Sequence, residues 1–274
     1  MEGQEYSRRY AAEHWASHVQ VAHTSHIMRM METLFDFDLP HFAARVRIYD
    51  MDKPRWHLVK DTATPLYYAA LCGFDNLVKH LVKKYPGHLN ALGGQDDYPM
   101  VAALHKEHTQ VANLLLQHDA NVDRRGTYGR TPLHQAITLF NETVLGALWF
   151  LLKHGADENC QQLDSRTPLH LAAAWGNDKV TQILLGPPSA HEGDFGLVQL
   201  LIDHGAVVNT QDMHYIAPLH FASYRRNFES VQLLLNHGTN VNAQDTHGRT
   251  PLHQVFEDSS VHEDSFGLIQ LLVK

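Results

Sequence analysis

The sequence is poor in cysteine and has no excess of positive charge. Only two cysteines, Cys72 and Cys160, occur among 274 residues, and they lie far apart. A fold held together by disulfides is therefore not expected, and we predict a reducing, intracellular and cytoplasmic location. The balance of 22 Lys+Arg against 30 Asp+Glu gives a formal net charge of -8, whereas nucleic-acid binding needs a basic surface. Nucleic acid is therefore not an expected partner.

Long apolar runs and catalytic motifs are also missing. No stretch of 18 apolar residues occurs, so no membrane span is expected, and the first residues lack the apolar centre of a signal peptide. The phosphate-binding G-x-x-x-x-G-K-[ST] loop, the H-E-x-x-H zinc motif and the G-x-S-x-G turn do not occur. His–acid clusters at 191–194 and 262–264 lack zinc-site spacing and precede apolar helical segments, as acidic helix starts do. We predict a protein that is not an enzyme, with no catalytic residues, cofactor or metal.

What the sequence does contain is a unit that recurs about every 33 residues. Each copy opens with a step similar to Thr-Pro-Leu-His and continues to an apolar segment that in several copies ends in His-Gly. The copies are spaced by 34, 33, 36, 50 and 33 residues. They start at Thr64, Tyr98, Thr131, Thr167, Ala217 and Thr250. The pattern resembles the ankyrin repeat, whose T-P-L-H-x-A signature and period it shares over residues 61–274.

The residues of the unit independently predict two helices. The threonines can cap a helix, and the proline that follows suits the first helical position, where no N–H partner is needed. Leucines and small alanines then form an apolar face, and Gly155, Gly205 and Gly238 can end the second helix. A single pair cannot bury its apolar face, so pairs must stack. We expect an all-α ankyrin-repeat solenoid of about six helix-turn-helix repeats.

The 22 histidines admit two interpretations, a metal site or a repeated structural position. Four belong to the Pro-Leu-His step, and four end the second helices. The first four are His134, His170, His220 and His253, and the second four are His118, His154, His204 and His237. The ankyrin resemblance implies that the first set bridges backbone groups of neighbouring repeats, which we favour because buried polar groups are normally hydrogen-bonded.

Residues 1–60 do not follow the repeat and leave two interpretations open. Their amphipathic segments predict a helical cap that covers the first repeat, as solenoids need. Alternatively, YAAEHWASHV, the later IYD and then TPLYYAA resemble the linker and ankyrin region of fungal NACHT–ankyrin proteins, which are NLR-like STAND signalling NTPases. That resemblance implies a sensor or regulatory part of such a protein, lacking the NTPase module in this chain.

The preferred function is non-catalytic protein recognition on the concave ankyrin surface. The ankyrin resemblance places that surface on the loops between repeats and on the first helices, where Tyr, Trp and Arg favour binding hot spots. We rank Trp175, Tyr224 and Arg225 highest, although Trp175 has the alternative of packing under the insertion that follows it. Leu163 belongs to the same loops but is not among the candidates. The twelve candidates are Tyr128, Arg130, Asp164, Arg166, Trp175, Met213, His214, Tyr215, Tyr224, Arg225, His247 and Arg249.

Two irregularities in the repeat carry further predictions. The fourth copy contains two candidate second helices, separated by the prolines of the segment GPPS. We predict a spare short helix at 178–185 and the true second helix at about 195–204. The sequence also stops inside its last apolar segment, without a polar outer repeat, which predicts fraying, self-association through that repeat or a missing continuation.

Overall fold

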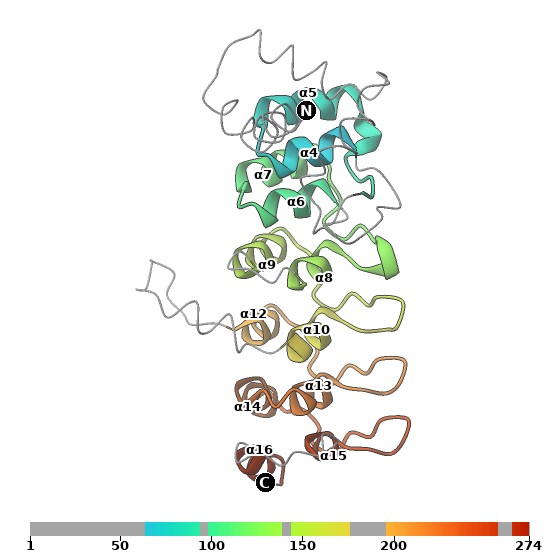
Figure 1. Ribbon diagram of the computed structural model, residues 1–274, viewed down its shortest axis with the longest axis vertical. Helices are drawn as coiled ribbons and strands as arrows, with labels where there is room; N and C mark the ends of the chain where they lie inside the picture. Colours follow the sequence, from blue (N-terminus) through green and yellow to red (C-terminus); the bar gives the residue numbers. More distant parts are fainter. Residues whose placement is uncertain (1–63, 94–97, 139–143, 176–195, 257–264, 274) are drawn as a thin grey trace, which may run out of the picture. The chain divides into compact units, whose positions relative to one another are not determined.

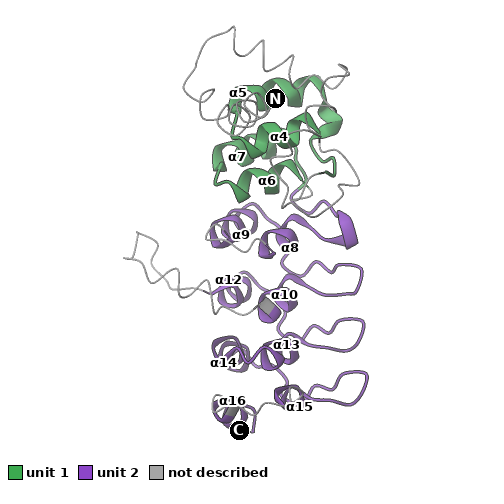
Figure 2. Ribbon diagram, viewed as in Figure 1, with its two compact units in different colours: residues 1–121 green, residues 122–274 purple. Residues whose placement is uncertain are grey.

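All regular secondary structure in the described part of the chain is helical. The structure is a computed structural model that describes residues 64–93, 98–138, 144–175 and 196–273. These residues form twelve α-helices and two short 3-10 helices and contain no strand. The chain divides into two compact units, residues 1–121 and 122–274 (Figure 2). The expected cap at 1–60 lies outside the described residues and stays a prediction.

Unit 1 contains two helix pairs in its described residues. Helix α4 packs against α5 and α6, and α7 packs against α5 and α6. The helices are α4 (Pro65–Leu71), α5 (Asp75–Lys84), η1 (Pro86–His88), α6 (Pro99–His105) and α7 (Thr109–Gln117). Tyr98 replaces the usual threonine before α6 and gives that helix no side-chain cap.

The described residues of unit 2 form four helix pairs, each packed on the next. The first helices contact one another in the order α8, α10, α13 and α15, and the second helices α12, α14 and α16 form a parallel row beside them (Figure 1). The elements are η2 (Thr127–Gly129), α8 (Pro132–Ile137), α9 (Val144–Lys153), α10 (Pro168–Trp175), α12 (Leu197–Asp203), α13 (Pro218–Tyr224), α14 (Phe228–Asn236), α15 (Pro251–Val255) and α16 (Ser265–Leu272).

The core of unit 2 lies between the two rows of helices. The leucine of each Pro-Leu-His step in α8, α10 and α13 is fully buried, and the alanine three residues later is buried beside it. Because alanine has a small side chain, neighbouring helices can approach closely. The second helices contribute the fully buried residues Leu148, Leu151, Leu201 and Leu234.

Each Thr-Pro-Leu-His step forms a cap at the start of its own helix. In α10, the backbone N–H of Thr167 donates to Nδ1 of His170 at 3.1 Å, and the Thr167 hydroxyl lies 2.8 Å from that nitrogen. The same contacts occur at Thr131 and Thr250. At α13, Ala217 replaces threonine, and only its backbone N–H reaches the histidine. Since a backbone N–H can only donate, Nδ1 must be the accepting, unprotonated nitrogen.

The other ring nitrogen of these histidines ties each helix pair to the next. It donates to a backbone carbonyl in the loop before the following helix, so the ring is the neutral Nε2–H tautomer. Burial lowers the pKa of His134 and His170 to about 4 and also lowers that of His220. The expected bridging role is therefore confirmed for three of the four histidines: His134 bonds to Arg166 at 3.2 Å, His170 to Ile216 at 3.0 Å and His220 to Arg249 at 3.1 Å. For His253 the described residues show only the contacts with its own cap, Thr250.

A second set of histidines closes the second helices. In each of three helices Nδ1 donates to the carbonyl four residues earlier at 2.8 Å, and a glycine with positive φ follows at once. The glycine is needed because other residues are strained in the left-handed region. The pairs are His154 with Gly155, His204 with Gly205, and His237 with Gly238.

The fourth repeat has its second helix where the sequence predicted it. Helix α12 spans Leu197–Asp203, within the predicted range of about 195–204, and packs against α10 and α14. Its end at Gly205 follows the pattern of the other second helices. This part of the prediction is confirmed, whereas the spare helix at 178–185 lies outside the described residues.

The histidine bridges lead to a first prediction on stability. Replacing His170 by alanine leaves the buried Thr167 N–H and the Ile216 carbonyl without their partner, so we expect a loss of about 3 kcal/mol in the free energy of unfolding. His253→Ala is the matched control, because His253 is exposed and its hydrogen bonds in the described residues are to Thr250. We expect that control to lose about 1 kcal/mol or less. Urea unfolding followed by circular dichroism measures both, and equal losses would contradict the bridging role.

Candidate functional site

Four loops project along one side of unit 2, each just before a first helix (Figure 1). We call them fingers 1 to 4, residues 124–130, 161–166, 211–216 and 244–249. A backbone hydrogen bond of 3.0 Å joins each finger to the next, because the tip of one donates to the carbonyl at the tip of its neighbour. These bonds run from Leu163 to Tyr128, from Met213 to Asp164 and from Thr246 to His214. The fingers therefore form one continuous edge within unit 2.

Buried aspartates fix fingers 3 and 4 from inside. The side chain of Asp212 is fully buried. Its Oδ1 accepts the backbone N–H groups of His214 and Ile216 at 2.9 and 3.0 Å. Its Oδ2 accepts Nε of Arg166, from finger 2, at 3.2 Å. One carboxylate thus closes its own turn and neutralises a guanidinium from the preceding repeat.

Asp245 repeats this arrangement inside finger 4. It accepts the backbone N–H groups of His247 and Arg249 and, at 2.8 Å, the Nε of Arg249. Burial opposes ionisation, but these hydrogen bonds and the nearby guanidinium outweigh it, so the pKa of Asp245 lies below its ordinary value. The carboxylate is therefore charged at neutral pH and holds Arg249 in place.

Finger 2 carries glutamine where fingers 3 and 4 carry aspartate. Gln162 is buried and accepts Nε of Arg130 at 3.3 Å. The Arg130 guanidinium lies over the Tyr128 ring, 5.9 Å from its centroid. Arg125 adds a bond from Nη1 to the Gln161 carbonyl at 2.8 Å. Arginines from finger 1 therefore hold finger 2, as Arg166 holds finger 3.

One position in each finger adopts a backbone conformation that suits glycine. The position two residues before each first-helix cap has positive φ in all four fingers, and fingers 1 and 4 have glycine there. Finger 3 has Tyr215 instead, with φ of 59° and its side chain 60% exposed. A bulky residue in this region costs about 1 kcal/mol or more, which is typical of functional positions.

The twelve candidates divide into two groups and one exception. Seven are exposed on the fingers and on α13: Tyr128, Met213, His214, Tyr215, Tyr224, Arg225 and His247. Four are partly exposed and also hold the fingers together: Arg130, Asp164, Arg166 and Arg249. The exception is Trp175, which ends α10 but whose side chain lies outside the described residues.

The selection of candidates missed one prominent side chain. Leu163, at the tip of finger 2, is 78% exposed, more than Tyr128 at 70%. The sequence places Leu163 on a loop between repeats, but it is not among the twelve candidates. Its place in the repeat, one residue before Asp164 at a finger tip, is the signal that could have identified it.

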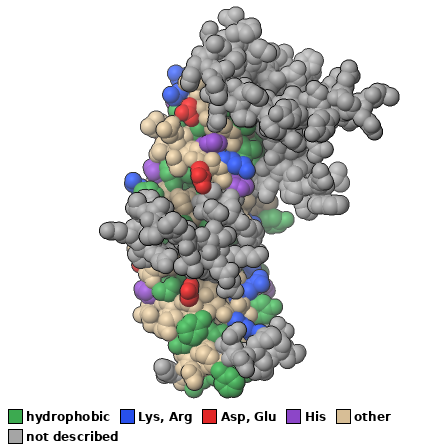
Figure 3. Space-filling view, turned by 60° about the vertical axis from the view of Figure 1, so that its left-hand side comes forward, with side chains coloured by type: hydrophobic (Ala, Val, Ile, Leu, Met, Phe, Trp, Pro, Cys, Tyr) green, Lys and Arg blue, Asp and Glu red, His purple; other side chains and the backbone are tan. Residues whose placement is uncertain are grey.

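Large apolar side chains are also exposed away from the fingers. Trp149 on α9 is 50% exposed, and the Lys153 ammonium lies 4.6 Å from its ring centroid. Phe228 on α14 and Phe266 on α16 are exposed near the C-terminal end of unit 2, where hydrophobic side chains show on the surface (Figure 3). Single exposed apolar side chains are common in proteins, so these carry less weight than the row on the fingers.

Neither cysteine nor histidine builds a reactive centre in the described part of the chain. Burial raises the pKa of the Cys72 and Cys160 thiols to about 12, and a protonated thiol is a poor nucleophile. No group of three or more His, Cys, Asp or Glu side chains in these residues could hold a metal ion. The His–acid clusters at 191–194 and 262–264 lie outside the described residues.

The comparison with protein families decides what this architecture is. The family model described as Ankyrin repeats (3 copies) matches residues 66–161, 100–191 and 189–261, which together cover more than half of the chain. The chain belongs to the ankyrin-repeat family. Ankyrin repeats are generally protein-interaction modules and are typically not catalytic. A comparison with curated proteins found no match.

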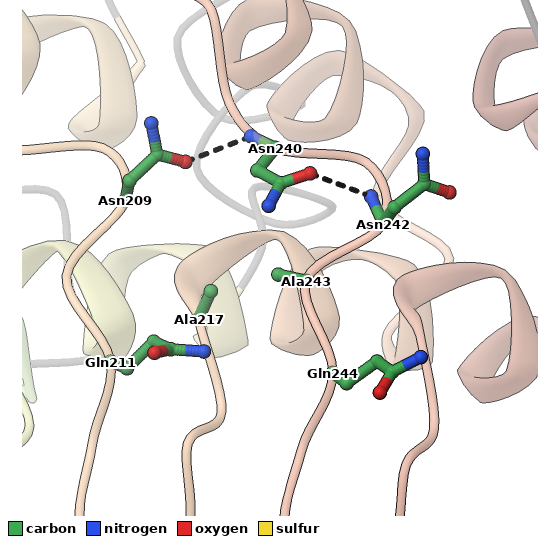
Figure 4. Close-up of a pocket in the computed structure, with 7 residues that line it drawn as sticks. All are labelled: Asn209, Gln211, Ala217, Asn240, Asn242, Ala243 and Gln244. Carbon is green, nitrogen blue, oxygen red and sulfur yellow. Dashed lines mark hydrogen bonds between the residues drawn. The ribbon is translucent and has the colours of Figure 1, made fainter.

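The ankyrin fold also leaves an open polar pocket beside fingers 3 and 4. It has a volume of about 360 Å³ and lies where the linkers that follow α12 and α14 run side by side (Figure 4). Asn209 crosses this gap by accepting the backbone N–H of Asn240 at 2.8 Å. The walls carry amide and methyl groups only, from Asn209, Gln211, Ala217, Asn240, Asn242, Ala243 and Gln244. The pocket therefore lacks a nucleophile, a base and a charged group.

None of the described helices is long and apolar enough to cross a membrane. The ankyrin helices here are short and have one apolar side toward the stack.

A prediction follows from the buried carboxylate of finger 3. Asp212→Ala removes three hydrogen bonds and leaves the Arg166 guanidinium without its buried partner, so we expect a loss of about 3 kcal/mol in unfolding free energy. Asp164→Ala is the control, because the Asp164 carboxylate is partly exposed and lies 3.4 Å from the same guanidinium. The control should lose less than about 1 kcal/mol. Urea unfolding measures both variants, and equal losses would show that finger 3 does not depend on Asp212.

Proposed function

We propose that unit 2 binds another protein through its fingers and the exposed residues of its first helices, without catalysing a reaction. The observation that carries this proposal is the row of large exposed side chains at the finger tips, Tyr128, Leu163, Met213 and Tyr215. Apolar and aromatic side chains in one row lose water-exposed surface when a partner covers them. We call this surface, together with the exposed residues of α8, α10, α13 and α15, the finger face.

The hydrogen bonds between fingers support the proposal because they order the surface before binding. The backbone bonds that join the tips, and the arginines that hold each finger from its neighbour, fix the positions of the exposed side chains. A surface that is already ordered loses little conformational entropy on binding. The finger face would thus act as a rigid, concave display of aromatic and charged groups.

The strained backbone at Tyr215 gives a second, independent argument. Glycine would fit this position without strain, as in fingers 1 and 4, yet finger 3 carries an exposed tyrosine. The aromatic ring makes no contribution to the core that would offset the backbone cost. Binding of a partner by the ring would account for a tyrosine at this strained position, since tyrosine is frequent in interface hot spots.

The proposal includes all twelve candidates in two roles. The seven exposed residues, Arg225 among them, would contact the partner. Trp175 stays a proposed contact from the sequence alone. Arg130, Asp164, Arg166 and Arg249 would chiefly position the fingers, because their side chains already bind other finger residues. Self-association through the last helix pair stays a prediction, supported by the exposed Phe266 and Val273 of that pair.

The alternative function is a sensor or regulatory part of an NLR-like NACHT protein. It depends on the N-terminal segment 1–60, which lies outside the described residues and outside the family match. A sensor array would also bind its ligand on repeat surfaces, so the finger face would have the same role in either case. We therefore adopt the simpler function of partner recognition.

The proposal predicts that binding and stability separate at finger 3. The double variant Tyr215→Gly/Tyr224→Ala should bind its partners about tenfold more weakly, or weaker still, as expected when two hot-spot residues are removed. Its urea midpoint should stay the same or rise, because glycine relieves the strain at position 215. Trp149→Ala on α9 is the control, since it removes an equally exposed aromatic side chain from the second helices.

Affinity capture from the native cell extract, with quantitative mass spectrometry, measures this prediction. Proteins retained by the parent chain and by Trp149→Ala, but lost with the double variant, would support the finger face. An identical set of proteins for all three chains would remove the finger face from the site.

A further inference from the structure

The charges of unit 2 are separated between its two sides. The fingers and first helices, residues 124–138, 161–174, 211–226 and 244–256, contain seven arginines, no lysine and no glutamate. Their only acids are Asp164, Asp212 and Asp245. The second helices and the linkers after them, residues 144–160, 197–210, 227–243 and 265–273, contain four acids and one cation, Lys153. The segments outside the described residues are not counted, and among them 257–264 contains four acidic residues.

Burial removes most of the negative charge from the finger face. The carboxylates of Asp212 and Asp245 are buried and bind the guanidiniums of Arg166 and Arg249. Asp164 is the one partly exposed acid on this side in the described residues, and it lies 3.4 Å from Arg166. The other arginines on this side in the described residues are Arg124, Arg125, Arg130, Arg225 and Arg226. The described residues of this side therefore carry more cations than acids, although the whole chain has a formal net charge of -8.

The arginines on this side are interleaved with aromatic rings. The Arg130 guanidinium lies 5.9 Å from the Tyr128 ring centroid, and the Arg225 guanidinium lies 5.9 Å from that of Tyr224. Stacking on a ring orients the planar guanidinium. A guanidinium can bind a carboxylate with two parallel hydrogen bonds. Each pair thus offers an apolar contact and an anion contact side by side.

We propose that the finger face selects an acidic segment of a partner protein, in which Asp or Glu residues alternate with apolar or aromatic residues. This inference rests on the proposed function and adds the chemistry of the partner. Carboxylates would bind the exposed arginine edges, and apolar side chains would cover Tyr128, Leu163 and Met213. Complementary charge would also speed the encounter between the proteins.

A nucleic-acid ligand fits this surface less well. A phosphate backbone needs a continuous track of cations and is repelled by nearby negative charge. The acids Asp157, Glu158, Asp203 and Glu229 lie on the other side of the same unit, and no lysine extends the arginine cluster along the fingers. The exposed Leu163 and Met213 suit an apolar side chain better than a phosphate.

A random-peptide phage library selected on the full chain tests the partner chemistry without assuming a sequence. We expect the selected pool to be enriched in Asp and Glu spaced by Tyr, Phe, Leu or Ile. Synthetic copies of the leading peptides should bind about tenfold more weakly when the salt concentration rises from about 50 to about 300 mM. Fluorescence polarisation measures these affinities.

Variants of the chain then locate the charge effect. The double variant Arg124→Gln/Arg225→Gln should bind the leading peptides about tenfold more weakly than the parent chain. Lys153→Gln is the matched control, because it removes one cation from the second helices and should leave the affinity unchanged. Equal effects of the two changes would contradict the assignment of the acidic segment to the finger face.

The remaining outcomes separate this inference from the proposed function. Neutral or basic peptides that lose affinity in Tyr215→Gly/Tyr224→Ala would overturn the acidic partner and leave protein recognition by the finger face intact. A library that gives no binder, or binders unaffected by that double variant, would overturn both. Binding of oligo(dT) as tightly as the best peptide would also overturn the acidic protein segment as the ligand.

Discussion

The hydrogen bond from a buried histidine to the carbonyl before the next helix is the constraint on which unit 2 depends. His134, His170 and His220 each accept a backbone N–H of their own cap at Nδ1 and donate from Nε2 to the following repeat. The ring can do both only as the neutral Nε2–H tautomer. One side chain thus fixes the start of a first helix and the base of the next finger, so helix packing and finger position are coupled.

The positions of the residues on the finger face depend on this coupling. The carbonyls that the histidines reach belong to Arg166, Ile216 and Arg249, at the ends of fingers 2, 3 and 4. From those bases the fingers are held further by backbone bonds between their tips and by the two buried aspartates. A network of buried polar groups therefore holds the fingers that carry the exposed tyrosines, Leu163 and Met213. The shape of the fingers depends on these buried groups and not on the exposed side chains at their tips.

Much of this architecture follows from local sequence, and the site follows only in part. The helix starts at Thr131 and Thr167 were predictable because cap, proline and histidine lie within four residues of each other, and α12 was predictable because Gly205 marks its end. The pairing of Arg166 with Asp212 could not be predicted from local sequence, because these residues are 46 positions apart and an insertion separates their repeats. Sequence reasoning therefore placed Arg166 among the partner contacts but did not foresee that its guanidinium binds Asp212 in finger 3.

The tautomer and protonation of His134, His170 and His220 test the central claim most directly. Long-range ¹H–¹⁵N correlation spectra of the chain, recorded from neutral pH downward, report both ring nitrogens of each histidine. We predict that these three rings carry their proton on Nε2 at neutral pH, and that His134 and His170 remain neutral until the pH approaches about 4, because burial lowers the pKa of both to that value. A proton on Nδ1, or protonation of His134 and His170 near the ordinary pKa of 6.5, would contradict the account.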